Sequence, residues 1–385
     1  PSINYILDIL ENILEKNVPV IEPHIPTVLE EFYARFKGIK DNLKNCKRDL
    51  NILSRIGQVM IDRSVTQKRP ETKSVCSKVI SLLVPFLRSQ HRLSDEVKCD
   101  ILDTIHALAS LVDDMSGHVG LMSRLFVPGN GMLTRNSRTK LVKLFVHLGN
   151  LPETKWLKDA SILLQDLVAY DEHTIDSYDF DKRLRAMTVL SKNSLEPYTC
   201  KPPCVHGIIY QTFKSMHDDD FSLRQAACRV MNNFVRFVGR NSNSETDKVY
   251  VVETVVIPQI KEGLKSRKTA VRKGFLLLLR EIAKSFNQTA KKKYPLLHLD
   301  LKNLFDEDND QDIFANLMHV QPHRRARALA RLRDRINMLE ANTITGIFLP
   351  MIMHNLHEAK KDTENVLIQE SIITIEAIAS TLPWS

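Results

Sequence analysis

Residues 271–286 read VRKGFLLLLREIAKSF, a basic turn followed by a run in which apolar residues recur at helical spacing. The same pattern occurs at 223–238 as LRQAACRVMNNFVRFV and at 97–112 as VKCDILDTIHALASLV. Further copies begin at residues 137, 182, 323 and 365, the last of them without the basic residue. Each stretch predicts an amphipathic helix that begins at a basic or polar turn.

The spacing of these copies indicates the architecture. The equivalent basic residues are Lys98, Arg138, Arg183, Arg224, Arg272 and Arg324. Most intervals between them lie near the roughly 40–47 residues that separate HEAT or armadillo repeats. The pattern predicts an all-α fold, a HEAT/armadillo-type α-solenoid in which helix pairs stack into a superhelix. Such an array acts by surface recognition, which argues against a compact catalytic pocket.

The composition fits one continuous array over residues 1–385. The chain has 12 Gly and 6% aromatic residues, which does not favour a β-rich fold. A single compact core rarely grows beyond about 250–300 residues, whereas each solenoid repeat buries its apolar face only against its neighbours. The sequence opens PSINYILDIL and closes STLPWS without a polar capping repeat. We therefore expect a fragment of a longer solenoid.

Cysteine usage and hydropathy further limit the class of protein to which the sequence can belong. Six cysteines are scattered along the chain, mostly within helical patterns, which is typical of reduced thiols in an intracellular protein. No run of about 18 apolar residues occurs, so the sequence predicts no membrane-spanning helix.

The net charge of +8 is concentrated in one stretch. Residues 258–340 contain 18 Lys or Arg and 10 Asp or Glu, so this basic sub-region carries the whole excess of the chain. Within it, residues 306–312 read DEDNDQD, which we expect to be a solvated acidic loop. The run resembles a calcium loop, but Gln311 replaces the turn glycine and Leu317 stands where the bidentate Glu is needed.

The basic helix expected at 323–336 gives the sharpest functional signal. Four arginines, at 324, 327, 331 and 335, fall on one stripe of this helix, while the leucines and isoleucine face elsewhere. Planar guanidinium groups match phosphate geometry and make binding steeply salt-dependent. The candidate RNA- or partner-binding residues are Lys265, Arg267, Lys268, Arg272, Lys273, Lys291, Lys292, Lys293, His323, Arg324, Arg325, Arg327, Arg331, Arg333 and Arg335.

A structural role for these arginines is the alternative. Helices of repeat proteins often carry Arg that pairs with acids of the next repeat, and the acidic run 306–312 lies close in sequence. Arg325 falls on the apolar side of the helix, which favours a structural role for it. Aromatic residues are almost absent from the patch, so contact with the nucleic-acid backbone is favoured over base stacking.

Motifs for catalysis, cofactors and metals are missing. The sequence contains no P-loop, no nucleotide-binding glycine fingerprint, no GxSxG and no HExxH. Cys200, Cys204 and His206 could ligate zinc, but no second ligand cluster follows at suitable spacing. The sequence therefore predicts a protein that is not an enzyme, with no catalytic residue, cofactor or metal site.

Two segments carry a family resemblance. Residues 310–332, DQDIFANLMHVQPHRRARALARL, and residues 170–187, YDEHTIDSYDFDKRLRAM, resemble the giant HEAT-repeat protein of the small-subunit processome, the "down-regulated in metastasis" or U-three small-nucleolar-RNA-associated family. The resemblance implies a nucleolar (nuclear), non-catalytic scaffold in a large ribonucleoprotein. It implies precursor ribosomal RNA, small nucleolar RNA and other processome proteins as partners in maturation of 18S RNA, with no membrane, small-molecule substrate or cofactor.

The resemblance also bears on individual residues. It makes six basic residues candidate contacts to RNA or to neighbouring processome proteins: His323, Arg324, Arg325, Arg327, Arg331 and Arg333. The alternative function is a protein-only HEAT scaffold or a nuclear transport receptor. Such receptors usually expose acidic inner helices to basic cargo, so the concentrated positive charge counts against that alternative.

Overall fold

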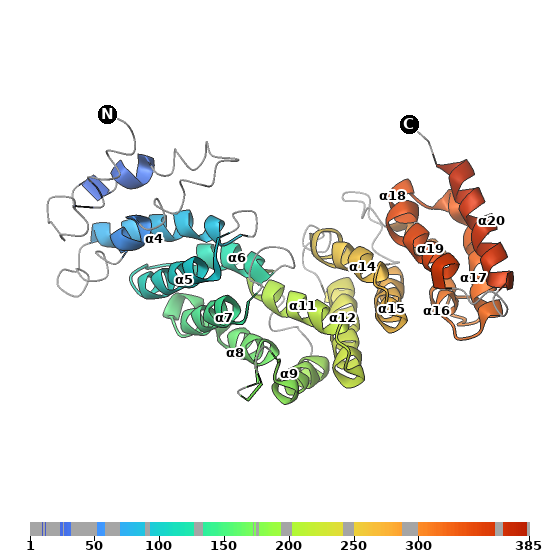
Figure 1. Cartoon of the computed structure of the whole chain (residues 1–385), viewed down its shortest axis with the longest axis horizontal. Helices are drawn as coiled ribbons and strands as arrows, with labels where there is room; N and C mark the ends of the chain where they lie inside the picture. Colours follow the sequence, from blue (N-terminus) through green and yellow to red (C-terminus); the bar gives the residue numbers. More distant parts are fainter. Residues whose placement is uncertain are drawn as a thin grey trace. The chain divides into compact units, whose positions relative to one another are not determined.

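The described part of the chain is helical throughout (Figure 1). The computed structural model describes residues 10, 12, 24–25, 27–31, 52–57, 70–88, 93–126, 134–171, 173–174, 177–193, 202–241, 250–286, 299–358 and 365–382. Within these ranges the only β-type pairing is one isolated antiparallel bridge between Tyr170 and Tyr178. The all-α expectation is therefore confirmed for the described residues.

The chain divides into two compact units. Unit 1 comprises Pro1–Ala186 with Pro197–Gln211, and unit 2 comprises Met187–Glu196 with Thr212–Ser385. The helices of unit 1, the last two of which continue into unit 2, are α4 (Pro70–Leu83), α5 (Asp95–Ala109), α6 (Ser116–Ser123), α7 (Arg135–Gly149), α8 (Lys158–Leu167), α9 (Phe180–Asn193) and α11 (Pro202–Met216). Those of unit 2 are α12 (Phe221–Asn241), α14 (Ile257–Leu264), α15 (Thr269–Ser285), α16 (Ile313–Leu317), α17 (Pro322–Asp334), α18 (Ala341–Thr343), α19 (Leu349–Glu358) and α20 (Asn365–Thr381).

Helix starts follow local capping chemistry. The side chains of Ser94, Thr134 and Asp312 accept hydrogen bonds from backbone N–H groups in the first turns of α5, α7 and α16. These bonds satisfy donors that have no partner within the helix. A proline stands in the first turn of α14 and of α17, where its missing N–H costs nothing.

Helices pack against others that lie near them along the chain. In unit 1, α5 contacts α4 and α7, and α7 contacts α8. In unit 2, α15 contacts α12, α14 and α16, while α17 contacts α16 and α20. The core consists of fully buried aliphatic and aromatic side chains such as Ile105, Leu148, Phe275 and Leu332. Among the described residues, no helix is long and apolar enough to cross a membrane.

Several polar contacts join residues that lie 40 to 45 positions apart in the sequence. In unit 1, Ser77 bonds His118 and Arg138 bonds Tyr178, at separations of 41 and 40 residues. In unit 2, Asn233 bonds the carbonyl of Ser191, 42 residues earlier. Others join Arg236 to Glu281 and Glu340 to Asp300, at separations of 45 and 40 residues. These separations are close to the spacing of the basic turns in the sequence.

Most of the basic residues that mark the sequence copies are buried. Lys98 and Arg138 are each 9% exposed, Arg183 is 5% exposed and Arg272 is 3% exposed. Arg272 donates from Nη1 to the carbonyls of residues 266 and 267, at 2.8 and 3.0 Å. Arg224 makes the same pair of bonds to residues 218 and 219, at 2.7 and 3.1 Å. In both copies the guanidinium holds the turn that precedes its own helix.

Candidate nucleic-acid interface

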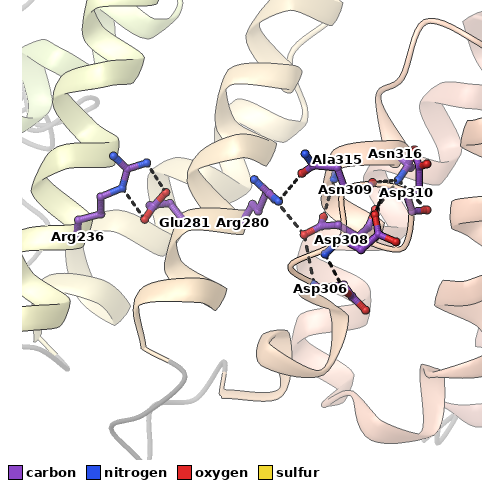
Figure 2. Close-up of polar contacts among 10 residues, drawn as sticks. Arg236, Arg280, Glu281, Asp306, Asp308, Asn309, Asp310, Ala315 and Asn316 are labelled. Atoms are coloured by element: carbon purple, nitrogen blue, oxygen red, sulfur yellow. Dashed lines mark hydrogen bonds and ion pairs between the residues drawn. The ribbon is translucent and has the colours of Figure 1, made fainter.

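The acidic loop 306–312 lies between the short 3-10 helix Leu299–Leu304 and α16 (Figure 2). Its backbone is closed by side chains: Asp306 accepts from the N–H of Asp308 at 2.9 Å, and Asp308 accepts from that of Asp310 at 3.0 Å. The amide nitrogen of Asn316 donates to the carbonyls of Asn309 and Asp312, at 2.7 and 2.8 Å. The loop therefore has a defined conformation built from its own Asp and Asn residues.

One acid of this loop is not solvated, contrary to the expectation for the run. Asp312 is fully buried, whereas Asp308 and Asp310 are exposed. The Asp312 carboxylate accepts from Ala315 N at 2.8 Å and from Arg280 Nε at 2.9 Å. Arg280 also donates to Asn309 Oδ1 at 2.9 Å, so α15 binds the middle of the loop and its last residue. A buried carboxylate needs this cation and these donors to offset its lost hydration.

Two arginines of the α17 stripe bind the acidic loop. Arg324 Nη1 lies 3.0 Å from Asp310 Oδ1, and Arg331 donates to the backbone carbonyl of the same residue. Arg335 donates to the carbonyl of Asn303 at 2.8 Å. The stripe is therefore largely engaged within unit 2. Such contacts are what the structural alternative for these arginines requires.

The remaining basic residues of α17 differ in exposure. Arg333 pairs with Glu370 of α20, and Arg325 is half-buried. Arg327 and His323 are exposed, and Arg327 makes no polar side-chain contact with any other residue that the structure describes. The free cation of the helix is thus Arg327, four residues and about one turn after His323.

The basic residues around the turn between α14 and α15 also differ in exposure and in their partners. Lys265 lies 3.4 Å from Glu262, and Lys268 pairs with Asp219, both at the surface. Arg267 is exposed, but Arg272 is buried with its guanidinium bonded to the turn. Lys273, the next residue on α15, is exposed. Lys291, Lys292 and Lys293 lie outside the described residues.

His319 lies beside the candidate basic residues of α17, and the sequence analysis did not single it out. It lies between α16 and α17, where its N–H donates to the Asn316 carbonyl at 3.1 Å. Partial removal from water lowers the pKa of His319, and the cations Arg324, Lys273 and His323 lower it further, whereas Asp310 raises it. The charge of Lys273, on α15, therefore acts on the His319 ring in the turn before α17. His319 stands in the quoted stretch 310–332, but nothing in that stretch points to Lys273, 46 residues earlier.

The described residues contain no group of three or more His, Cys, Asp or Glu side chains arranged to hold a metal ion. That includes the acidic loop, whose carboxylates bond to arginines and to the loop backbone. Cys200 lies outside the described residues, and the side chains of Cys204 and His206 are not described.

Comparison with known proteins places the chain in a family. The family model described as "U3 small nucleolar RNA-associated protein 20, N-terminal" matches residues 2–268. The chain belongs to this family. The protein named U3 small nucleolar RNA-associated protein 20 in Schizosaccharomyces pombe is 26% identical over 328 residues, which is 80% of this chain and 12% of the relative. The protein of the same name in Saccharomyces cerevisiae is 26% identical over 255 residues, 65% of this chain and 10% of the relative.

The family resemblance expected from the sequence is thereby confirmed. The chain spans about a tenth of the length of these two curated relatives of the U3 small nucleolar RNA-associated protein 20 family. The matched residues 2–268 include the hairpin-like segment at 170–187 but end before α17 and the acidic loop. The candidate basic residues on α15 and α17 therefore lie beyond the part that the family model matches.

Proposed function

We propose that this chain is part of a non-catalytic α-solenoid scaffold in ribosome biogenesis. It acts in the nucleolus, within the small-subunit processome, where it braces precursor ribosomal RNA and assembly factors during maturation of 18S RNA. The observation that carries this proposal is the family match over residues 2–268, together with two relatives whose names associate them with U3 small nucleolar RNA.

Packing within each unit supports the solenoid part of the proposal. Helices contact their neighbours along the chain, and polar contacts between helices recur about 40 residues apart. The turn-holding geometry of Arg224 is repeated by Arg272, which lies 48 residues later. Each repeat of a solenoid contacts only its neighbours, and its equivalent residues occupy equivalent environments. We propose that successive repeats stack in this way along the whole array.

The proposed mechanism is architectural. An extended helical surface binds several partners at once, so each contact gains effective concentration from the others. Contacts from Lys and Arg to phosphates then position the RNA without reading its bases. The candidates whose side chains stay exposed are Lys265, Arg267, Lys268, Lys273, His323 and Arg327. Arg272 belongs to the interior of unit 2, and the proposed surface does not include it.

A protein-only scaffold, including a nuclear transport receptor, is the second candidate function. It is favoured by the engagement of Arg324, Arg331 and Arg333 within unit 2, because these cations are then less available to an RNA backbone. Against it stand the names of the two relatives, which associate them with an RNA.

Depletion of the full-length protein tests the proposed function. Loss of a small-subunit scaffold should lower 18S RNA and raise its unprocessed precursors, measured by hybridisation with probes to the precursor spacers. Large-subunit RNA from the same cells provides the internal control. Normal 18S maturation, with a defect in nuclear import of a reporter instead, would favour the transport-receptor alternative.

A further inference from the structure

We infer that Lys273, His319, His323, Arg324 and Arg327 form one site for a phosphodiester group of an RNA backbone. The site lies in unit 2, on α15, on the turn before α17 and on the first two turns of α17. This inference rests on the proposed function and deepens it, because it names one binding site and the chemistry that it recognises.

His319 is oriented as a hydrogen-bond donor. Its Nδ1 accepts a hydrogen bond from the backbone N–H of Gln321 at 3.1 Å. In the neutral imidazole one ring nitrogen accepts and the other carries the proton, so the proton lies on Nε2. The bond to Gln321 and the bond from His319 N–H to Asn316 fix the ring position. The Nε2–H group is thus available to donate to a ligand oxygen.

The basic residues of the site come from two different helices. Lys273 belongs to α15, whereas His323, Arg324 and Arg327 follow each other on α17. His323 and Arg327 are four residues apart and share one face of the helix. Exposed Lys and Arg groups that converge from separate elements create a local positive potential, which attracts phosphate. The site has no Phe, Tyr or Trp among its members, so it favours the backbone over base stacking.

One carboxylate faces this cluster, and it is the exchangeable partner. Asp310 is bound by Arg324 in an ion pair in which the Arg324 side chain is 36% exposed and the Asp310 side chain 67% exposed. Exposed ion pairs contribute little net stability because water and salt screen them. A phosphodiester oxygen can therefore replace the Asp310 carboxylate at Arg324, while Arg331 keeps the loop in place through the Asp310 carbonyl.

A phosphodiester fits this site better than an acidic peptide. The site offers a guanidinium fork, an ammonium group and a neutral imidazole donor, which match the oxygens of one bridging phosphate. The neighbouring loop exposes Glu307 and Asp308, which repel any polyanion, so only a ligand with strong local complementarity binds. RNA supplies such groups in a regular series and gains from each further contact along the chain.

Fluorescence anisotropy of a labelled single-stranded RNA with the purified 385-residue chain tests the site. Lys273→Ala and Arg327→Ala should each weaken binding by about tenfold, a typical loss for one charge-assisted hydrogen bond. Each should also reduce the slope of log affinity against log salt by about 0.7. Matched controls are Lys143→Ala on α7 and Arg185→Ala on α9, exposed residues of unit 1 that should leave RNA binding unchanged.

Competition and cellular binding separate the possible outcomes. Poly-glutamate that displaces RNA at equal charge concentration would overturn the preference for phosphodiesters, and displacement by millimolar inorganic phosphate alone would reassign the site to a free anion. Wild-type affinity in both site variants would also overturn the site. That result leaves the proposed function intact if the full-length variant still recovers precursor ribosomal RNA from cells. If the wild-type full-length protein recovers no precursor ribosomal RNA from cells, the proposed function itself is contradicted.

Discussion

Arg236 of α12 grips Glu281 of α15 through two parallel hydrogen bonds, Nε to Oε1 and Nη2 to Oε2, each 2.8 Å long (Figure 2). The preceding residue, Arg280, binds Asp312 and Asn309 of the acidic loop. Two adjacent charged residues of α15 thus bind two other elements: Glu281 binds α12, and Arg280 binds the N-cap residue of α16. Opposite signs at neighbouring positions let one helix join two others without leaving either charge unpaired.

Removal of Arg280 should destabilise unit 2 through the buried Asp312. Arg280→Met leaves a fully buried carboxylate without its cation, although Asp312 keeps hydrogen bonds from the N–H groups of Ala315 and Asp306. Loss of one partner of a buried pair costs about 3–5 kcal/mol. We expect about 3 kcal/mol, because Arg280 is itself 26% exposed. Urea unfolding followed by circular dichroism measures the change.

The matched control is the double variant Arg280→Met with Asp312→Asn. Asparagine keeps the helix cap of α16 but carries no charge, so much of the lost stability should return. A double variant as unstable as Arg280→Met alone would show that the charge of Asp312 is not the cause.

Arg272 and Lys273 should separate stability from RNA binding. Arg272→Met removes a buried guanidinium that bonds the carbonyls of residues 266 and 267, so these part-buried acceptors lose their side-chain donor. We expect a loss of about 2 kcal/mol or more in the free energy of unfolding. Lys273→Ala, one residue later on the exposed face, should change stability by less than about 0.5 kcal/mol. Equal stability of the two variants would contradict the structural role of Arg272.

Gly263 should tolerate no side chain. A Cβ atom added there would lie 2.2 Å from the ring of Phe275, which is fully buried where α14 crosses α15. Gly263→Ala therefore forces the ring or the helix to move, at a cost of about 1–3 kcal/mol. Gly117→Ala on α6 is the control, because no atom lies within 4 Å of its added Cβ. Thermal unfolding of both variants measures the difference.

RNA affinity should rise as pH falls. Partial burial and the cations Arg324, Lys273 and His323 hold the pKa of His319 below its ordinary value, so the free ring is neutral at pH 7. A bound phosphate raises that pKa, so binding takes up a proton and strengthens as pH falls through the pKa of the bound form. The gain levels off below the pKa of the free form. A difference of one unit between the pKa values of the free and bound forms gives an increase of about tenfold in RNA affinity.

Anisotropy titrations between about pH 7.5 and about pH 5.5, the range around the ordinary histidine pKa, measure this dependence. His319→Gln keeps a polar donor but cannot titrate, so most of the pH dependence should disappear. An unchanged pH profile in His319→Gln would assign the proton uptake to another group.

Local chemistry made much of the fold predictable. Apolar spacing and the basic turn before LLLLREIAKSF predict α15, and the same signals predict α5, α7, α12 and α17. Helix periodicity is a local property, so it can be read from any window of one helix. The family resemblance rests on two such windows, 170–187 and 310–332.

The roles of the charged residues were less predictable, because they depend on tertiary contacts. Arg272 and Lys273 are both basic and adjacent, yet one is buried against a turn and the other is exposed. Arg331 reaches the carbonyl of Asp310, which lies 21 residues earlier. The charge of Lys273 acts on His319 because α15 packs against α16. No periodicity in the chain encodes those distances.

Ultraviolet crosslinking of the full-length protein to RNA in cells is the most direct test of the central claim, that this family member contacts precursor ribosomal RNA through unit 2. Sequencing identifies the RNA, and mass spectrometry of the crosslinked peptides locates the contact. We predict precursor ribosomal RNA or U3 small nucleolar RNA attached to peptides that contain Lys273 or residues 319–327. Recovery of the protein with no ribosomal precursor and no crosslink in these peptides would contradict the account.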